Sequence, residues 1–120
     1  MLAIVATNRK ERFASFQQGA EQDGTLTLSY ASTGLSALEL VRSKKPEMLI
    51  VDAELPDFKP LELVSEMLKV WAFTQAAVVD SMDEHEFHEE SEGLGVLMQL
   101  DDPPSHENGV KLLQALSAVV

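Results

Sequence analysis

The sequence predicts an α/β protein in which a single doubly wound, five-stranded parallel sheet carries helices on both faces. Short apolar runs alternate five times with segments of helical spacing along the 120 residues. Such runs are typical of parallel strands that are covered on both sides. Right-handed crossovers then return each helix to the sheet, so the five units form one sheet between two helical layers. The length suits one domain, residues 1–120, and we find no linker or repeat.

The five predicted strands consist of apolar residues or of residues that suit a pleated surface. They cover residues 2–6, 25–30, 48–51, 76–79 and 96–100. The carboxyl ends of parallel strands lie at one edge of the sheet, and we expect any ligand chemistry at that edge.

The helices between the strands have recognisable caps, stops and apolar faces. The fourth helix, within residues 82–92, has only Met82 and Phe87 as large apolar anchors and is expected to be short and loosely docked. The expected caps and stops are Thr7 or Asn8 and Asp23-Gly24 for the first helix, residues 32–34 and 44–46 for the second, Pro60 or Leu61 as the start of the third, and Ser105, after the turn 101–104, for the last. The expected inward-facing residues are Phe13, Phe16 and Ala20 in the first helix, Leu35, Leu38 and Val41 in the second, Leu61, Val64, Leu68 and Trp71 in the third, and Val110, Leu113 and Leu116 in the last.

Charge and cysteine content exclude several classes of function. The net charge of −11 divides into −2 for residues 1–69, where ten acids face eight cations, and −9 for residues 70–120, where ten acids face Lys111 alone. Such a surface repels phosphate backbones, so we expect no direct nucleic-acid binding. The lack of cysteine excludes disulfides, thiolate catalysis and cysteine-ligated zinc. The apolar start is too short for a membrane span and unlike a signal peptide, so we expect a cytoplasmic protein without an anchor.

The most informative segment is residues 45–57, where the apolar run 48–51 ends abruptly at Asp52 and Pro56 follows. A buried strand that delivers one carboxylate to a turn places that acid at the edge where ligands bind. This segment, its acidic turn, and Ser81 at the end of the fourth strand resemble the receiver domain of two-component response regulators. The resemblance covers essentially the whole chain and implies the flavodoxin-like strand order 2-1-3-4-5.

In that family the strand-three aspartate attacks a phosphoryl donor, two acids after strand one hold magnesium, a strand-four hydroxyl contacts the phosphoryl group, and a strand-five lysine neutralises it. The resemblance implies that Asp52 is the candidate phosphoacceptor and that Ser81 is the candidate phosphoryl-contacting hydroxyl. It also implies that Glu54 holds the position whose backbone carbonyl helps to bind the metal.

The remaining parts of that machinery are missing. Ala6, Thr7 and Asn8 stand where the acidic pair belongs, and they offer at most neutral oxygen ligands to a divalent cation. Residues 96–104 contain no cation, so Leu100, Asp101 or Asp102 takes the place of the lysine. The chain therefore resembles a degenerate receiver, or pseudo-receiver, for which we expect no bound metal or cofactor and slow phosphotransfer.

Three cations, Arg9, Lys10 and Arg12, fall in the first turn of the first predicted helix, where the helix dipole disfavours positive charge. We hypothesise that Arg9 reaches Asp52 or Glu54 and stands in for the absent metal as a built-in counterion. A solvated basic patch is the alternative.

Other residues with potential ligand chemistry have simpler interpretations. His85 and His88 lie near Glu84 and Glu89 and could form one edge of a metal site, but a histidine pair without a third convergent ligand is more typical of an exposed acidic face. The aromatic residues of the predicted helical stripes, Phe13, Phe16 and Trp71, are expected in the core rather than in a cofactor platform.

The leading functional hypothesis is a protein-interaction module of a two-component or phosphorelay type of signalling system, and not an enzyme. It would bind a histidine kinase, a phosphotransfer protein or an effector, with weak or absent magnesium-assisted phosphorylation of Asp52. The acidic stretch 80–92, with Asp101 and Asp102, predicts a partner that carries a basic patch; a homodimer through this surface is open.

Two alternatives belong to other classes of function. The first is a working phosphoacceptor that takes phosphate from a histidine kinase onto Asp52 with non-standard ligands such as Asn8 and Glu54. The second is a carrier of flavin or nucleotide, which the segment 7–10 disfavours because it offers one hydroxyl and no glycine to cradle a phosphate.

Overall fold

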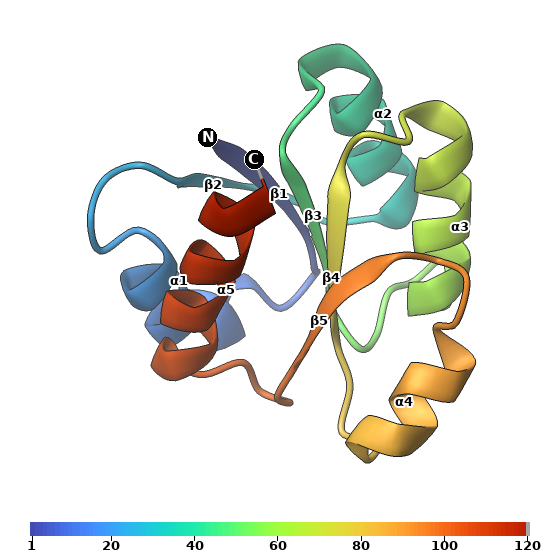
Figure 1. The fold of residues 1–120 in the computed structure, drawn as a ribbon. Helices are drawn as coiled ribbons and strands as arrows, with labels where there is room; N and C mark the ends of the chain where they lie inside the picture. Colours follow the sequence, from blue (N-terminus) through green and yellow to red (C-terminus); the bar gives the residue numbers. More distant parts are fainter. Residues whose placement is uncertain (120) are drawn as a thin grey trace.

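The computed structural model describes residues 1–119, which form one five-stranded sheet between helices (Figure 1). The strands are β1 (Leu2–Ala6), β2 (Thr27–Ala31), β3 (Met48–Val51), β4 (Gln75–Val79) and β5 (Val96–Leu100). They lie in the order β2-β1-β3-β4-β5, and every neighbouring pair is parallel. The predicted fold class and strand order are therefore confirmed.

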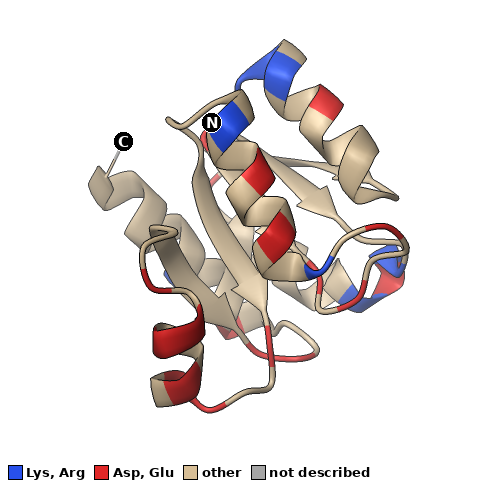
Figure 2. Ribbon diagram, turned by 90° about the vertical axis from the view of Figure 1, so that its right-hand side faces the viewer, with Lys and Arg blue, Asp and Glu red and all other residues tan. Residues whose placement is uncertain are grey.

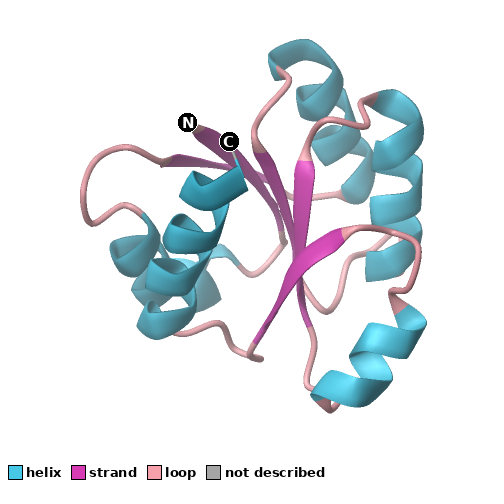
Figure 3. Cartoon of the chain, viewed as in Figure 1, coloured by secondary structure: helices cyan, strands magenta, loops and turns pink. Residues whose placement is uncertain are grey.

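Helices cover both faces of this sheet. They are α1 (Ala14–Ala20), α2 (Gly34–Lys44), α3 (Pro60–Val70), α4 (Glu84–Glu90) and α5 (His106–Val119), and a 3-10 turn (Lys10–Phe13) precedes α1. In Figure 1, α1 and α5 lie on one face and α2 and α3 on the other, with α4 at the lower end next to β5. Figure 3 shows the same layers by type of structure.

The core consists of two apolar clusters, one on each face of the sheet. Alternate residues of β1 point to opposite faces, as the period of two in a strand requires. Ala3 and Val5 belong to the cluster under α1 and α5, whereas Ile4 and Ala6 belong to the cluster under α2 and α3. All four are completely buried, which explains why the central strands are apolar throughout.

The predicted strand ranges 2–6, 48–51 and 96–100 match the structure, and the other two differ by one or two residues. The second strand begins at Thr27 because Thr25 is held in a turn, where its backbone N–H and its hydroxyl both donate to Asp23. The hydrogen bond from the Thr25 hydroxyl lowers the pKa of Asp23. The fourth strand gains Gln75, whose N–H donates to the Glu47 carbonyl.

The first helix differs most from its prediction. Neither Thr7 nor Asn8 caps an α-helix; a 3-10 turn at Lys10–Phe13 comes first, and α1 starts at Ala14. The Thr7 hydroxyl is engaged elsewhere, because it accepts from the Arg9 N–H and donates to Asp52. The predicted stop at Asp23-Gly24 is confirmed, because a turn at residues 21–23 follows the helix and leads to Gly24, which has a φ of +77°.

The start of α2 is fixed by two sets of side chains. Thr33, within the predicted cap 32–34, forms a capping box with Ser36, in which each side chain bonds the other residue's backbone N–H. Asp57, from the loop after β3, accepts from the N–H groups of Gly34 and Leu35 at 2.9 Å each. Asp57 therefore links the acidic turn after β3 to α2, and the helix ends at Lys44, with Lys45 as its cap before Pro46, within the predicted stop 44–46.

Most predicted core residues are buried, but a few positions were assigned to the wrong face. Phe13 and Phe16 are fully buried and meet edge to face at 5.8 Å. Leu35 was predicted to point inward but is 59% exposed, because the buried stripe of α2 runs through the residues Gly34, Ala37, Leu38 and Val41. The fully buried residues of α3 are Leu63, Val64 and Met67, whereas Leu61, Leu68 and Trp71 are half-buried at the edge of the core. In α5, Val110 is half-buried, and Leu112 joins Leu113 and Leu116 inside.

Two glycines let α1 and α5 cross with their backbones in contact. A Cβ at Gly19 would lie 2.1 Å from the His106 carbonyl oxygen, and one at Gly109 would lie 2.2 Å from the Phe16 carbonyl oxygen. No side chain fits in either place.

The fourth helix is short, as predicted, with Phe87 as its buried anchor. None of the helices in residues 1–119 has the length and apolar composition needed to cross a bilayer.

Candidate functional site

Asp52 directly follows β3 and lies at the carboxyl edge of the sheet, as predicted. Its N–H donates to the Ala6 carbonyl at 3.0 Å, so the pairing with β1 continues for one residue past the strand. The residue is 1% exposed. A carboxylate at such a position requires hydrogen bonds or a counterion to offset its loss of hydration.

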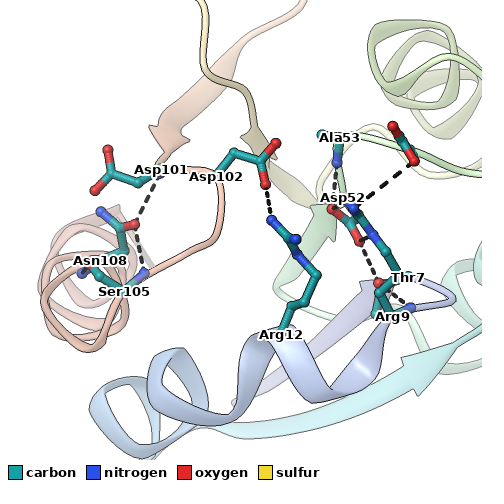
Figure 4. Close-up of polar contacts among 10 residues, drawn as sticks. Thr7, Arg9, Arg12, Asp52, Ala53, Asp101, Asp102, Ser105 and Asn108 are labelled. Carbon is teal, nitrogen blue, oxygen red and sulfur yellow. Dashed lines mark hydrogen bonds and ion pairs between the residues drawn. The ribbon is translucent and has the colours of Figure 1, made fainter.

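Four donors satisfy the Asp52 carboxylate (Figure 4). Oδ2 accepts from the Thr7 hydroxyl at 2.6 Å and from Arg9 Nε at 3.2 Å. Oδ1 accepts from Arg9 Nη2 at 2.8 Å and from the Ala53 N–H at 2.7 Å. Each oxygen thus has two partners, and the Arg9 guanidinium meets the carboxylate with two parallel N–H groups.

Arg9 is therefore the built-in counterion of Asp52, and the hypothesis of this pairing is confirmed by the geometry. The hydrogen bond to Asp52 raises the pKa of the Arg9 guanidinium despite the opposing effect of burial, and the charge of Asp52 raises it further. Glu54 is a minor partner, because its carboxylate lies 4.0 Å from Arg9 Nη1 and its side chain is 80% exposed.

Thr7 is a site residue that sequence reasoning did not assign to Asp52. It lies directly after β1, is 3% exposed, and has its hydroxyl between Asp52 and the Arg9 backbone. The hydroxyl donates to the first and accepts from the second, so it positions both members of the ion pair. The signal was a hydroxyl at the end of a strand next to β3, at the edge where Asp52 was expected.

A second ion pair at this edge was also missed. Arg12 Nη2 contacts Asp102 Oδ1, which brings the turn after β5 to the segment after β1 (Figure 4). Asn108 in α5 shapes that turn, since its side-chain oxygen accepts from the N–H groups of Asp101 and Ser105 at 3.0 Å each. Ser105 in turn caps α5 by accepting from the Asn108 N–H, as predicted.

These residues do not fit a magnesium ion. The positions after β1 carry no carboxylate, and a guanidinium occupies the space beside Asp52 where a cation would bind. Among residues 1–119, no group of three His, Asp or Glu side chains is arranged to hold a metal ion. Both carboxylate oxygens of Asp52 already have two donors, so a hard cation would have to displace Arg9 first.

Ser81 follows β4 but is not joined to the site around Asp52. It is exposed, and within the described part of the chain its hydroxyl makes no hydrogen bond. It lines an open groove of about 760 Å³ between α4 and β5. Neighbouring Asp80 accepts from the Met82 N–H at 2.7 Å, which shapes the turn into α4.

The histidines of α4 are exposed, as expected. His85 lies 3.1 Å from Glu89 one turn later, an ordinary pair on a helix surface. The surface around them is acidic: Figure 2 shows the acidic bands of α4 at one end of the molecule and basic segments at the far end. Lys111, the only Lys or Arg after residue 69, pairs with Glu107 at 3.0 Å.

Solved structures of receiver domains superimpose on nearly the whole chain. The response regulator domain of CheB from Thermotoga maritima matches with a TM-score of 0.80 at 18% identity, covering 98% of this chain and 94% of that one. A CheY-like receiver domain protein from Methanospirillum hungatei matches with a TM-score of 0.80 at 18% identity and the same coverage. Chemotaxis response regulator CheY4 of Vibrio cholerae matches with a TM-score of 0.79 at 20% identity, covering 96% and 97%.

No protein-family model and no curated protein matches the chain. At these identities the structural likeness establishes the fold, which is the flavodoxin-like fold of response-regulator receiver domains.

Proposed function

We propose that this protein is a receiver-like signalling module that acts by binding other proteins and has little or no magnesium-assisted phosphorylation at Asp52. The observation that carries the proposal is the paired contact of Arg9 with both carboxylate oxygens of Asp52. Residues 1–120 make up the module.

Phosphorylation of Asp52 would require one carboxylate oxygen to be free for attack on an anionic donor. In this protein each oxygen accepts two hydrogen bonds, and the residue is 1% exposed. Attack would have to break contacts with Arg9 and Thr7 before any new bond forms. Phosphoryl transfer needs a metal or a free cation to offset the donor's charge. Directly after β1 this chain has Thr7 and Asn8 instead of acids that would hold a metal, Arg12 is paired with Asp102, and Lys10 lies 4.8 Å from the centre of the Tyr30 ring.

The phosphorylation test compares the protein with its Asp52→Asn variant. Both are incubated with magnesium and acetyl phosphate, and their intact masses are measured. We expect no phosphoryl adduct on either protein under conditions that fully label a working receiver domain. An adduct on the wild type that is absent from Asp52→Asn would overturn the proposal in favour of a working phosphoacceptor, with Ser81 as the candidate contact to the phosphoryl group.

The binding surface we propose is the acidic face formed by α4, β5 and the start of α5. It includes exposed carboxylates on α4, with Asp101 after β5; Asp102 lies beside them but is paired with Arg12. A partner that meets this face should carry a basic patch, and its affinity should fall as salt screens the attraction. A histidine kinase, a phosphotransfer protein or an effector with such a patch fits this role.

The partner test uses charge reversal on α4. The double variant Glu86→Lys/Glu90→Lys changes two exposed residues of α4, and Glu39→Lys on α2 is the matched control. We expect capture of the partner from a cell extract to be lost in the double variant and kept in the control. Capture that is unchanged by the double variant, or by high salt, would rule this face out.

A further inference from the structure

The loop between α3 and β4 carries an exposed pair of aromatic rings, Trp71 and Phe73, which we call the aromatic knob. The two ring centroids lie 5.1 Å apart. Trp71 is half-buried against the core cluster under α2 and α3, whereas Phe73 is 77% exposed. Within residues 1–119, Phe73 is the most exposed of the large apolar side chains.

The loop that carries the knob is fastened at Thr74, and one lysine, Lys45, lies against the knob. The Thr74 hydroxyl donates to the Pro46 carbonyl at 2.8 Å, which fastens the loop to the segment before β3. Lys45 places its ammonium 4.8 Å from the centre of the Trp71 ring and adopts a left-handed backbone with a φ of 47°. The neighbouring cation Lys44 is exposed, and Lys69 pairs with Glu66 at 3.3 Å. Fastening the loop lowers the conformational entropy that it loses on binding.

The opposite end of the molecule has a complementary surface. The groove of about 760 Å³ between α4 and β5, which we call the edge groove, has a mainly polar lining that is interrupted by the apolar side chains of Met82, Phe87 and Met98. Carboxylates of Glu84 and Asp101 also line it, and both residues are exposed. Its volume lies in the usual range for pockets that bind compact apolar groups. In Figure 1 the loop from α3 to β4 crosses the upper end of the sheet, whereas α4 lies at the lower end.

We propose that the aromatic knob of one copy docks in the edge groove of a second copy, so that the chains associate head to tail. Phe73 would lie against the apolar side chains of the edge groove, and Lys44 and Lys45 would face Glu84 and Asp101 on its polar lining. Large aromatic side chains supply most of the buried area in such contacts, and the opposite charges fix their orientation. The net charge of −11 does not prevent this at physiological salt, because repulsion between the bodies of the molecules is screened beyond about 8 Å.

This contact uses two different surfaces, so it does not close on itself as a symmetric dimer does. Each added copy leaves one free knob and one free groove. The mean mass should therefore rise past that of a dimer as the concentration increases. The inference does not depend on the phosphorylation state of Asp52, and its test needs only the purified protein.

The test measures the mass-average molecular weight by sedimentation over a concentration series up to about 1 mM, near physiological salt. Phe73→Asp removes the knob, and Glu84→Lys/Asp101→Lys changes the groove at two exposed positions. Leu35→Asp is the matched control, because Leu35 is another exposed large apolar residue but lies outside both surfaces. We expect the wild type and Leu35→Asp to associate to the same extent and each of the other variants to be monomeric.

Mixing the two monomeric variants gives the decisive result. The mixture contains one intact groove, on Phe73→Asp, and one intact knob, on the groove variant. We expect it to form a one-to-one dimer and nothing larger, with a shift in the fluorescence of Trp71, the only tryptophan in the chain. A wild type that stays monomeric, an association that stops at the dimer, or a mixture that stays monomeric would each overturn the proposal.

Discussion

Removal of Arg9 should destabilise the protein more than removal of the carboxylate that it pairs with. Arg9→Ala takes away two of the four donors to Asp52 and the only cation among residues 1–119 that contacts it. The carboxylate then remains at a 1% exposed position with Thr7 and Ala53 as its donors. Asp52→Asn removes the buried charge instead, and leaves Arg9 with 26% of its side chain in water.

The expected magnitudes follow from this asymmetry. Breaking a buried ion pair by removing one partner costs about 3–5 kcal/mol when the other charge stays buried. The Thr7 and Ala53 bonds remain, and water can reach the space that Arg9 leaves, so we expect about 3 kcal/mol for Arg9→Ala. Asp52→Asn should cost about 1 kcal/mol, because the Arg9 guanidinium that loses its partner is partly hydrated. The double variant contains no unpaired buried charge and should be more stable than Arg9→Ala alone by about 1 kcal/mol.

Urea denaturation followed by the fluorescence of the single tryptophan measures these differences. Arg42→Ala is the control, since Arg42 is an exposed cation and its loss should change stability by less than about 0.5 kcal/mol. The reasoning fails if the effects of Arg9→Ala and Asp52→Asn add in the double variant to within about 0.5 kcal/mol, because additive effects mean that the two side chains do not interact.

Three further predictions concern the scaffold. Gly109→Ala should destabilise the protein by about 2 kcal/mol in the same urea assay despite its better helix propensity, because its Cβ would overlap the Phe16 carbonyl oxygen, whereas the exposed helix position Ser117→Ala should be neutral. Asp57→Ala should cost about 1 kcal/mol through the loss of two bonds to the start of α2, and Asp57→Asn should restore part of it. Burial, and to a smaller extent the charge of Glu21, raises the pKa of Tyr30 to about 12, so phenolate absorbance of this single tyrosine should titrate near 12 in the folded protein and near 10 in urea. Because the pKa of Tyr30 is higher in the folded protein than in the unfolded protein, the stability linked to this difference is complete below pH 10 and is lost as the pH rises towards 12. A folded-state titration near 10 would contradict the raised pKa.

The fold was predictable because its signals are redundant. The strands 2–6, 48–51 and 96–100 are apolar runs bounded by turn residues, and each is too short for a helix. Their parallel arrangement follows from the helices between them. The strand order came from the resemblance to receiver domains, since composition alone fits other doubly wound arrangements equally well.

Details of the helices were less predictable, because tertiary contacts outweigh local preference. Leu35 fits an inward stripe at helical spacing, yet it lies in the first turn of α2, where Asp57 from another loop holds the backbone. Thr7 has the chemistry of a cap, but its hydroxyl donates to the buried Asp52 carboxylate instead. Leaving that carboxylate without a donor would cost more than leaving the start of a helix uncapped. The local sequence does not show that the Asp52 carboxylate lies next to Thr7, so these two costs could not be compared from it.

The candidate site was predictable in part. The position of Asp52 followed from the end of an apolar run, and its pairing with Arg9 followed from three cations in an unfavourable place. The same argument applied equally to Arg12, whose partner Asp102 was interpreted only as a carboxylate in place of a lysine. The missing information was the distance between the ends of β1 and β5, which are not neighbours in the sheet.

The segment after β1 explains why both pairs form together. Arg9 directly precedes the 3-10 turn, and its carbonyl accepts from the Arg12 N–H at 2.9 Å. This three-residue repeat places both side chains on the same side of the backbone. That side faces the carboxyl edge of the sheet, where one meets the acid after β3 and the other meets an acid after β5. Asp52 and Asp102 are thus neutralised from within the chain, whereas Asp101 and Glu54 at the same edge stay exposed. Because the two arginines form ion pairs with these internal carboxylates, neither is free to stabilise a phosphoryl group.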